Sequence, residues 1–315
     1  MSTVQTYPFD PTKDIPPLAG KLIFITGANT GLGKATAIEL AKHSPAHIYI
    51  TSRNSAKGNA ALEEVKKTAS EGIKVSLLEL DLSSFESIKS AAAEFLKRED
   101  RLDVLLLNAG VMGAPPTLTK DGYEMHMGTN HLGHALLLKL LKPVLDKTPD
   151  ARAVHLSSAG FRHVGPAGIE FDTFKSAKSE TALPYRYAQS KLACLLYARE
   201  ASKRYPNFKN IAINPGEENV ASKVAIPITE GVKNHFWAIT ALDIENGEFY
   251  EPVGKTGGLE GVKNHFWAIT ALDIENGEFY EPVGKTGGLE GHGLDDEMAK
   301  KLWDWTEEQL KDQVL

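Results

Sequence analysis

Lys21-Leu22-Ile23-Phe24-Ile25-Thr26-Gly27-Ala28-Asn29-Thr30-Gly31-Leu32-Gly33 is the stretch that decides the fold. A short apolar run ends in glycine-rich sequence, and apolar residues then recur with helical spacing from Ala35 to Ala41. An apolar run of this length is typical of a buried parallel strand. Glycines permit a tight turn and let backbone N–H groups approach a pyrophosphate, which the helix dipole also favours. The stretch therefore predicts a strand, a dinucleotide-binding loop and a helix, with an ordinary tight turn as the alternative.

Short apolar runs and helical patterns continue to alternate beyond this unit. Strands are expected at residues 47–50, 75–80, 104–107, 153–156 and 211–213. Helices are expected at 59–69, 85–96, 123–145, around 187–191, and at 295–310. Such alternation implies an α/β fold with a doubly wound parallel sheet, the Rossmann fold. No linker divides the chain, so we expect residues 1–315 to form a single domain with an irregular N-terminal arm at 1–20.

Composition excludes several classes of protein. A hydrophobic content of 42% and a charged content of 24% are ordinary for a soluble globular protein. The net charge of −6 gives no reason to expect nucleic acid or an anionic membrane as a partner. The single cysteine, Cys194, excludes an intrachain disulfide and suits a reducing compartment. No apolar run approaches the ~18 residues of a membrane span, and the start lacks a signal peptide's apolar core, so we expect a cytoplasmic protein.

The C-terminal third contains a duplicated segment. Residues 230–261 recur letter for letter as residues 260–291, so 230–259 and 260–289 form an identical tandem repeat. Each copy predicts a helix, at 232–242 and 262–272, followed by a strand, at 247–250 and 277–280. Solenoid repeats drift in sequence and usually need at least three units, which argues against a solenoid. A very recent duplication, an engineered insertion and a sequence error all remain open as its origin.

Arg53 stands about 20 residues beyond Gly33, at the end of the second expected strand. A carboxylate at this position would bind the ribose diol of NAD, whereas an arginine suits the additional 2′-phosphate of NADP. Lys34 adds positive charge nearby. The pattern predicts NADP(H) as the cofactor, with a solvated surface arginine as the alternative.

Tyr187-Ala188-Gln189-Ser190-Lys191 places a phenol and an ammonium group four residues apart on one helical face. Beside a nicotinamide, the lysine charge would lower the phenol's pKa from ~10 toward neutrality, so that the tyrosine can exchange a proton with an alcohol or carbonyl. The same spacing occurs from Tyr205 to Lys209, but that copy contains a proline and lies in an expected loop. The pair alone is a chance-level pattern, and its context must separate the two copies.

Several motifs, in order along the chain, resemble the short-chain dehydrogenase/reductase family. They run from about Lys21 to Gly216, and the closest resemblance is to its retinol-dehydrogenase-like and carbonyl-reductase branch. Beyond the Thr26–Gly33 loop and the Tyr187–Lys191 pair, the matching motifs are Ser52-Arg53-Asn54, Asp81, Asn108-Ala109-Gly110, Asn130-His131-Leu132-Gly133-His134, Ser158 and Pro215-Gly216. The order also shows that the Tyr205–Lys209 spacing is not the catalytic pair, because Tyr205 lies beyond the expected catalytic helix.

The resemblance implies an NADP(H)-dependent oxidoreductase in which Tyr187 is the acid/base. Ser158 would stabilise charge on the substrate oxygen, Lys191 would hold the nicotinamide ribose, and Asn130 would anchor a water that links Lys191 to bulk solvent. The implied catalytic residues are Asn130, Ser158, Tyr187 and Lys191. The implied cofactor-binding residues are Gly27, Asn29, Thr30, Gly31, Leu32, Gly33, Arg53, Asp81, Leu82, Asn108, Ala109, Gly110, Tyr187, Lys191, Pro215 and Gly216.

The implied substrate is a small carbonyl or alcohol compound, and an apolar one is our expectation. Aromatic and aliphatic residues between Ser158 and Tyr187 could line a lipophilic pocket or pack within a loop: Phe161, Phe171, Phe174, Leu183 and Tyr185. Related proteins often pair through the long helices that carry Asn130 and Tyr187. The resemblance therefore also implies a homodimer or homotetramer.

The chain departs from the family pattern after Gly216. The threonine usually found about four residues later is missing, and only residues 220–229 precede the first repeat copy, so the usual substrate lid is lost or replaced. We expect the second copy to fill the edge-strand position because it leads into the last helix. The first copy would then lie near the substrate mouth or fail to pack.

The sequence leaves two rival functions to weigh, and its histidines raise the alternative of a metal site. The chain could bind NADP(H) but turn over poorly, as a sensor or interaction module, or it could be a regulatory domain without a cofactor. The intact Asn130, Ser158, Tyr187 and Lys191 argue against the first, and the glycine loop argues against the second. His126, His131 and His134 could suggest a metal site, but no nearby Cys or carboxylate completes a tetrahedral set, so helix packing is the expectation.

Overall fold

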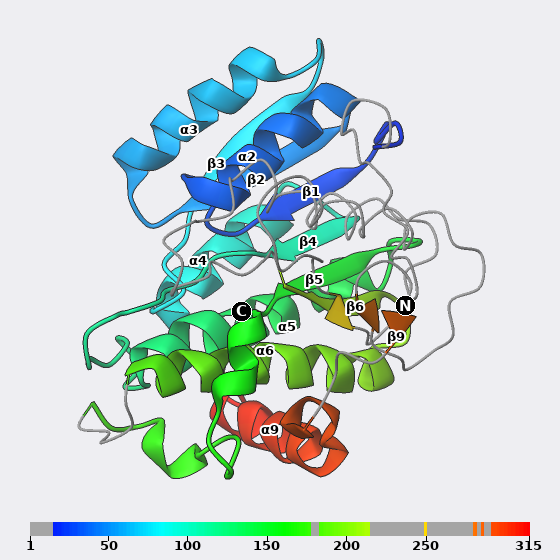
Figure 1. Ribbon diagram of the computed structural model, residues 1–315. Coiled ribbons are helices and arrows are strands. Elements are labelled where there is room, and N and C mark those ends of the chain that lie inside the picture. Colours follow the sequence, from blue (N-terminus) through cyan, green and yellow to red (C-terminus); the bar gives the residue numbers. More distant parts are fainter. Residues whose placement is uncertain (1–14, 178–182, 215–248, 251–279, 282–284, 287–290) are drawn as a thin grey trace, which may run out of the picture.

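The computed structural model describes residues 15–177, 183–214, 249–250, 280–281, 285–286 and 291–315. Within them, parallel strands form the centre of the molecule in the order β3-β2-β1-β4-β5-β6 (Figure 1). The strands are β1 Leu22–Ile25, β2 His47–Ser52, β3 Lys74–Glu79, β4 Val104–Leu107, β5 Arg152–Leu156 and β6 Lys209–Ile213. The chain steps outward from β1 to β3 and then crosses to β4 on the other side. This is the predicted doubly wound Rossmann topology, which is thereby confirmed.

Helices cover both faces of the sheet because both faces are apolar. Ile23 and Ile25 of β1 point to one face, where α2 (Gly31–Leu40) and α3 (Ser55–Thr68) pack. Leu22 and Phe24 alternate to the other face, where α4 (Phe85–Leu96), α5 (Gly133–Leu145) and α6 (Leu183–Arg204) pack. A parallel sheet buried in this way needs nearly continuous apolar strands, which the sequence supplies.

The helix expected at 123–145 is not a regular α-helix throughout. A π-helical segment, Met127–Leu132, precedes α5. Glycines allow close packing at both ends of the segment. A Cβ on Gly128 would lie 2.4 Å from Thr119 Cγ2, and one on Gly133 would lie 2.4 Å from the Leu82 carbonyl oxygen. A π-bulge is frequently found at a functional site, and this one contains Asn130.

Strand β7 corrects the prediction for the repeat. Phe249–Tyr250 of the first copy forms β7 and pairs in parallel with β6, and Tyr280–Glu281 of the second copy forms β8 beyond it. A final strand, β9 (Lys285–Thr286), pairs antiparallel with β8. The prediction that the second copy lies next to the main sheet was therefore wrong. Identical copies offer identical strands, so side chains cannot decide between them. The shorter connection favours the first copy, since each doubling of loop length costs ~0.6 kcal/mol. The helices expected at 232–242 and 262–272 lie outside the described residues.

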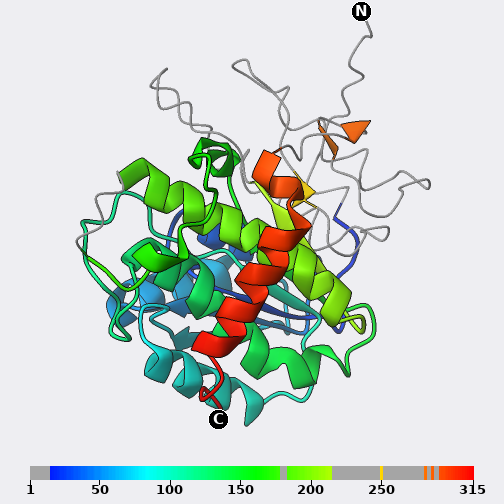
Figure 2. The same ribbon diagram turned by 90° about the horizontal axis from the view of Figure 1, so that it is seen from below.

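Helix α9 (Asp296–Gln309) packs across α6 and reaches α5 through a side-chain ion pair. Figure 2 shows it crossing α6. The Trp303 ring stacks on Tyr197 of α6, with the ring centroids 4.8 Å apart. Lys139 of α5 forms an ion pair with Glu307 at 2.9 Å. The last helix is thus fastened to both long helices of this face.

Candidate active site

The glycine loop after β1 is shaped by close backbone contacts. Gly27 and Gly31 adopt left-handed φ values of +66° and +55°, which favour glycine. A Cβ on Gly27 would lie 2.8 Å from Ala109 Cβ, and one on Gly33 would lie 2.5 Å from Asn108 Nδ2. Hydrogen bonds hold the same loop to its neighbours: Gly27 N donates to Thr51 Oγ1 at 3.1 Å. These close contacts and hydrogen bonds hold the loop in a defined conformation, which distinguishes it from an ordinary tight turn.

The N-terminus of α2 fits a phosphate group. Its N-cap residue, Thr30, is exposed and forms no capping side-chain hydrogen bond. By contrast, α3, α4 and α9 are capped by Asn54, Ser84 and Asp295. The N–H groups of the first turn of α2 thus lack a side-chain acceptor, and an anion can supply one. The predicted loop residues Asn29 and Leu32 flank this turn and are half-buried.

The Asn108-Ala109-Gly110 motif joins the glycine loop to the rest of the site. Asn108 Nδ2 donates to the Thr26 carbonyl at 2.8 Å, and Ala109 N donates to Thr26 Oγ1 at 2.9 Å. A Cβ on Gly110 would lie 3.3 Å from Asn130 Oδ1 and 3.6 Å from Lys191 Nζ. The motif, some eighty positions after Thr26 in the sequence, therefore connects the glycine loop to Asn130 and Lys191.

Arg53, at the end of β2, is exposed and forms no hydrogen bond or ion pair with the described residues. Lys34, which was expected to add charge nearby, instead pairs with Glu64 at 2.8 Å. Asp81 accepts hydrogen bonds from the backbone N–H and hydroxyl of Ser83 at 3.0 and 2.6 Å. Burial alone would raise the pKa of Asp81, but these hydrogen bonds and Lys120 hold it below the ordinary value. Leu82, beside Asp81, is buried.

Ser158, Tyr187 and Lys191 meet at the carboxyl end of β5. Lys191 Nζ is buried, donates to the Leu156 carbonyl at 2.9 Å, and lies 5.8 Å from the centroid of the Tyr187 ring. A Cβ on Gly160 would lie 3.2 Å from Ser158 Oγ and 3.3 Å from Tyr187 Cε1. Ser158 Oγ accepts from Gly160 N at 3.0 Å, which fixes the hydroxyl at the start of a short 3₁₀ turn. Three of the four predicted catalytic side chains thus converge.

Asn130 braces the loop that follows β4. Its Oδ1 accepts from Val111 N at 2.8 Å, and its Nδ2 donates to the Val111 carbonyl at 3.0 Å and to Ser190 Oγ at 2.9 Å. The π-bulge leaves the Asn130 carbonyl to side chains: His134 Nδ1 lies 2.9 Å from it and Cys194 Sγ lies 3.2 Å from it. These bonds show how the side chain is held, and the water expected at Asn130 stays a prediction.

The histidines are packing residues that also bridge elements distant in sequence, and it is this bridging that the spacing alone did not reveal. His134 Nε2 lies 2.9 Å from Thr26 Oγ1, so one imidazole joins the cofactor loop to the Asn130 bulge. His131 Nε2 lies 2.8 Å from Thr306 Oγ1 of α9. Burial lowers the pKa of His131 and of His134 to about 3. In the described residues, no cluster of His, Cys, Asp and Glu could hold a metal ion.

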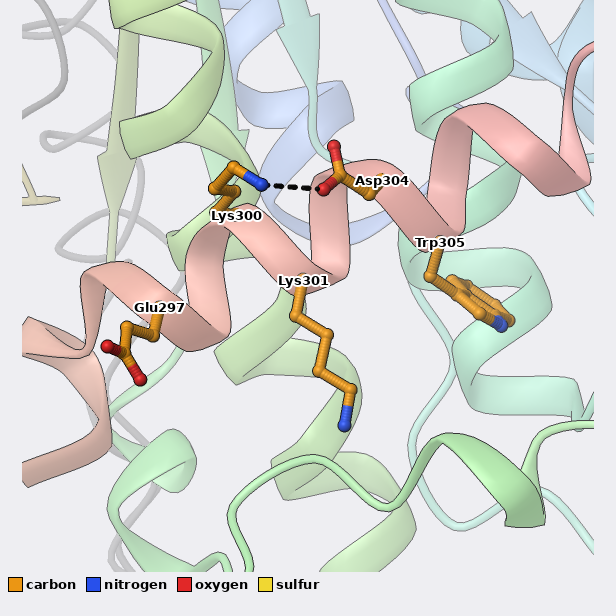
Figure 3. Close-up of a pocket in the computed structure, with 5 residues that line it drawn as sticks. All are labelled: Glu297, Lys300, Lys301, Asp304 and Trp305. Atoms are coloured by element: carbon orange, nitrogen blue, oxygen red, sulfur yellow. Dashed lines mark hydrogen bonds and ion pairs between the residues drawn. The ribbon is translucent and has the colours of Figure 1, made fainter.

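The last two predicted residues and a surface hollow lie apart from the residues described above. Pro215 and Gly216 lie outside the described residues. A hollow beside α9 is lined by other residues, namely Glu297, Lys300, Lys301, Asp304 and Trp305 (Figure 3). None of these is a predicted site residue, so the hollow is a feature of the α9 surface.

Known proteins resemble this chain in sequence and in fold. Residues 21–179 match the short chain dehydrogenase family. A short-chain dehydrogenase/reductase of Armillaria gallica is 33% identical over 98% of this chain and 97% of its own length. The chain belongs to the short-chain dehydrogenase family. Human retinol dehydrogenase 12 is 42% identical over 63% of this chain and 62% of its own length, which places the chain in the retinol-dehydrogenase-like branch.

Solved structures agree on the fold of this short-chain dehydrogenase. An uncharacterised protein from Mycobacterium paratuberculosis superposes with a TM-score of 0.69, at 28% identity, over 96% of this chain and 98% of its own. Two more distant structures show the fold alone. A Shigella flexneri dehydrogenase complexed with NADP has 19% identity and a TM-score of 0.57, over 75% of this chain and 98% of its own. An NADH-dependent reductase complexed with NAD has 20% identity and a TM-score of 0.60, over 74% of this chain and 95% of its own.

Family membership gives the coarse activity, a nicotinamide-dependent oxidoreductase that acts on alcohol or carbonyl groups. Among the described helices, none is long and apolar enough to cross a membrane.

Proposed function

We propose that this dehydrogenase interconverts a carbonyl compound and its alcohol with NADP(H), with Tyr187 as the acid/base. The observation that carries the proposal is the convergence of Tyr187, Lys191 and Ser158 beside a rigid glycine loop. NADP(H), when bound, supplies or accepts the hydride. Gly27, Gly31 and Gly33 would hold its pyrophosphate at the start of α2, and Arg53 would meet its 2′-phosphate.

The side chains divide the remaining chemistry among them. Tyr187 Oη donates a proton to the carbonyl oxygen in reduction and takes one from the alcohol in oxidation. Ser158 Oγ donates a hydrogen bond to the same oxygen, where negative charge develops. Lys191 Nζ, fixed by the Leu156 carbonyl, places a positive charge near the Tyr187 ring and favours the phenolate. Asn130 holds the Val111 loop against the site.

Tyr187→Phe tests the acid/base role. Removing the phenolic hydroxyl should lower kcat by about 10²–10⁴-fold, the usual contribution of general acid–base catalysis, while the Kd for NADPH stays near the parent value. NADPH oxidation against a panel of ketones and aldehydes gives kcat, and NADPH fluorescence gives Kd. Tyr205→Phe is the matched control, since Tyr205 lies beyond the end of α6. Substantial turnover by Tyr187→Phe would rule out this role.

Arg53 supports a preference for NADP(H) over NAD(H). Its exposed guanidinium makes no bond with the described residues and can pair with a phosphate. We expect Arg53→Asp to weaken NADPH binding by about ten- to hundredfold, the value of a charged hydrogen bond, and to leave NADH binding equal or stronger. Arg98→Asp, at the end of α4, is the control. Equal affinity of the parent protein for both cofactors would contradict the preference.

The aromatic residues between Ser158 and Tyr187 differ in exposure, and one exposed methionine lies on the loop after Gly110. Phe171 and Phe174 pack against Trp305 of α9, with ring centroids 5.9 and 5.2 Å away, and Phe161 is buried. These three are packing residues. Tyr185, on the first turn of α6, is 45% exposed, and Met112, on the loop after Gly110, is 63% exposed. Large apolar side chains that are exposed within two residues of Tyr187 and Gly110 favour an apolar substrate.

Helix α9 bears on the predicted homo-oligomer. Helix α6, one of the two long helices through which pairing was expected, carries α9 in the described residues. A homodimer or homotetramer stays a prediction. Light scattering during size-exclusion chromatography measures the oligomeric state directly. A cytoplasmic location also stays a prediction, which fractionation of the host cell would check.

A sensor with impaired turnover is the alternative function. It is favoured by the altered sequence after Gly216, where the usual threonine is missing. Both functions require NADPH binding, so the panel of ketones and aldehydes separates them. Turnover of any carbonyl with a Tyr187-dependent rate supports the enzyme, and tight NADPH binding without turnover supports the sensor.

A further inference from the structure

Buried polar side chains lie next to Tyr187 and take no direct part in the proposed chemistry. Glu124 is 3% exposed, His126 is 0% exposed, and Arg186, the residue before Tyr187, is 7% exposed. His126 Nδ1 lies 2.8 Å from Glu124 Oε1, and Arg186 Nη1 lies 3.8 Å from the same oxygen. The His126 ring meets the Tyr187 ring edge to face, with centroids 6.4 Å apart and an interplanar angle of 79°.

The bonds around His126 fix its tautomer. Ala114 N lies 3.3 Å from His126 Nε2, and a backbone N–H can only donate, so Nε2 must carry a lone pair. The proton is therefore on Nδ1, which donates to Glu124 Oε1. The second oxygen, Oε2, accepts from Met127 N at 2.8 Å. Burial alone would raise the pKa of Glu124, but the hydrogen bonds from His126 and Met127 hold it below its ordinary value, so the carboxylate is ionised.

His126 and Asn130 hold the loop that follows β4. Asn130 holds Val111 through two hydrogen bonds, and His126, one turn earlier, holds Ala114 through one. Between them lies Met112, whose exposed side chain is a proposed substrate contact. The position of this loop relative to Tyr187 thus depends on two side chains from one helical segment.

Fold stability alone does not account for the cluster. Burying charged and polar groups is costly, and apolar packing of similar volume is often as stable or more so. Arg186 Nε and Nη1 are buried and have no hydrogen-bond partner among the described residues. A cluster satisfied this incompletely gains little stability, but it does define one orientation of His126.

We propose that Glu124 and His126 are a positioning pair, which holds the Val111–Ala114 loop and the Tyr187 ring in the arrangement that substrate reduction requires. The proposal rests on the proposed function, because it treats Tyr187 as the acid. His126 touches the ring of Tyr187 and the loop backbone, so it acts through them rather than on the substrate. Glu124 acts indirectly, because it fixes the tautomer of His126.

Glu124→Gln tests the pair with almost no change of shape. The amide oxygen must face the Met127 N–H, so the amide NH₂ faces His126 Nδ1 and forces the proton onto Nε2. That proton would point at the Ala114 N–H, and the loop must move. We expect a rise in KM and a fall in kcat, together a ten- to hundredfold loss in kcat/KM, because a shift of about 1 Å costs up to ~10²-fold. NADPH Kd should remain within about twofold, and hydrogen exchange at the Ala114 amide should accelerate.

Two further variants complete the test. Glu94→Gln, on the exposed side of α4, is the matched control and should leave every readout unchanged. His126→Phe keeps a ring against Tyr187 but cannot accept from Ala114 N, so it should reproduce the exchange and KM effects, and it takes over as the test if Glu124→Gln does not fold. Parental kcat/KM together with parental exchange at Ala114 in these variants would overturn the proposal. If the parent reduces no carbonyl, the proposed function fails, whereas the exchange readout still decides whether the pair positions the loop.

Discussion

The cofactor half of the molecule, from β1 to β4, and the sheet edge beyond β6 are built in different ways. In the cofactor half, strands of four to six residues are tied together by contacts that tolerate no additional atom, such as Gly33 against Asn108 Nδ2. At the edge, β7, β8 and β9 contribute two residues each, and a single register pair, Tyr250 with Tyr280, joins the two copies. The close contacts specify one structure, whereas the duplicated sequence specifies the same strand twice.

After the short strand β9, helix α9 is again packed through buried side chains. Closely packed segments therefore lie both before and after the short edge strands in the sequence. Trp303 lies between Tyr197 and Tyr205, and His131 reaches Thr306. The helix after the repeat is thus fastened to the same face as α5 and α6. Among the described residues, helix α9 anchors the C-terminal part of the chain.

Trp303→Ala is expected to have the largest effect on stability. Truncating a buried tryptophan costs about 3–5 kcal/mol of the free energy of unfolding, because a cavity remains where the ring stacked. Urea unfolding followed by circular dichroism measures the loss. Lys300→Ala, on the exposed side of α9 (Figure 3), should cost no more than about 0.5 kcal/mol. Similar losses in the two variants would show that α9 is not an anchor.

Gly33→Ala tests the cofactor half. The new methyl group would lie 2.5 Å from Asn108 Nδ2 and 2.7 Å from the Gly27 carbonyl oxygen, so the loop must open. Overpacking of this kind costs about 1–3 kcal/mol, and NADPH Kd should rise by roughly hundredfold. Gly165→Ala is the control, because a Cβ there meets nothing within 4 Å. Retained NADPH affinity in Gly33→Ala would mean that the glycine loop is not the phosphate site.

The sequence predicted the cofactor half well because its constraints are local. Most strands from Leu22 to Ile213 contain an apolar run, and several motifs, such as Arg53, Asn108 and Ser158, follow a strand within two residues, where a parallel sheet brings such ends together. The convergence of Ser158, Tyr187 and Lys191 followed from motif order. The position of Arg53 followed from its distance to Gly33.

The parts that were missed depend on contacts distant in sequence. The bridge from Thr26 to His134 spans 108 positions, and the bond from His131 to Thr306 spans 175. No spacing rule encodes either one. The π-bulge accompanies a close approach of Gly133 to Leu82, and the order of β7 and β8 cannot be read from two identical copies.

Acid should weaken the anchoring of α9 through His131. Its pKa is lowered by burial to about 3 in the folded protein, against ~6.5 unfolded, so the unfolded state binds the proton first. The stabilisation is complete above pH ~6.5 and is lost as the pH falls toward 3. Between pH 7 and 5 this one group should cost up to about 2 kcal/mol of unfolding free energy. Urea unfolding at both pH values measures it. His131→Gln should remove that part of the pH dependence, and an unchanged dependence would refute it.

Deleting residues 260–289 should have the smallest effect. Because the copies are identical, deleting 230–259 yields the same polypeptide, so one variant tests both. The remaining copy can still offer Phe249–Tyr250 to β6, and the variant loses only β8, β9 and their few register pairs. We expect NADPH Kd within about twofold of the parent and a midpoint of thermal unfolding within a few degrees, since two-residue strands bury little surface. Loss of binding or of cooperative unfolding would show that the second copy carries structure which the first cannot replace, and the contrast between the cofactor half and the edge would no longer hold.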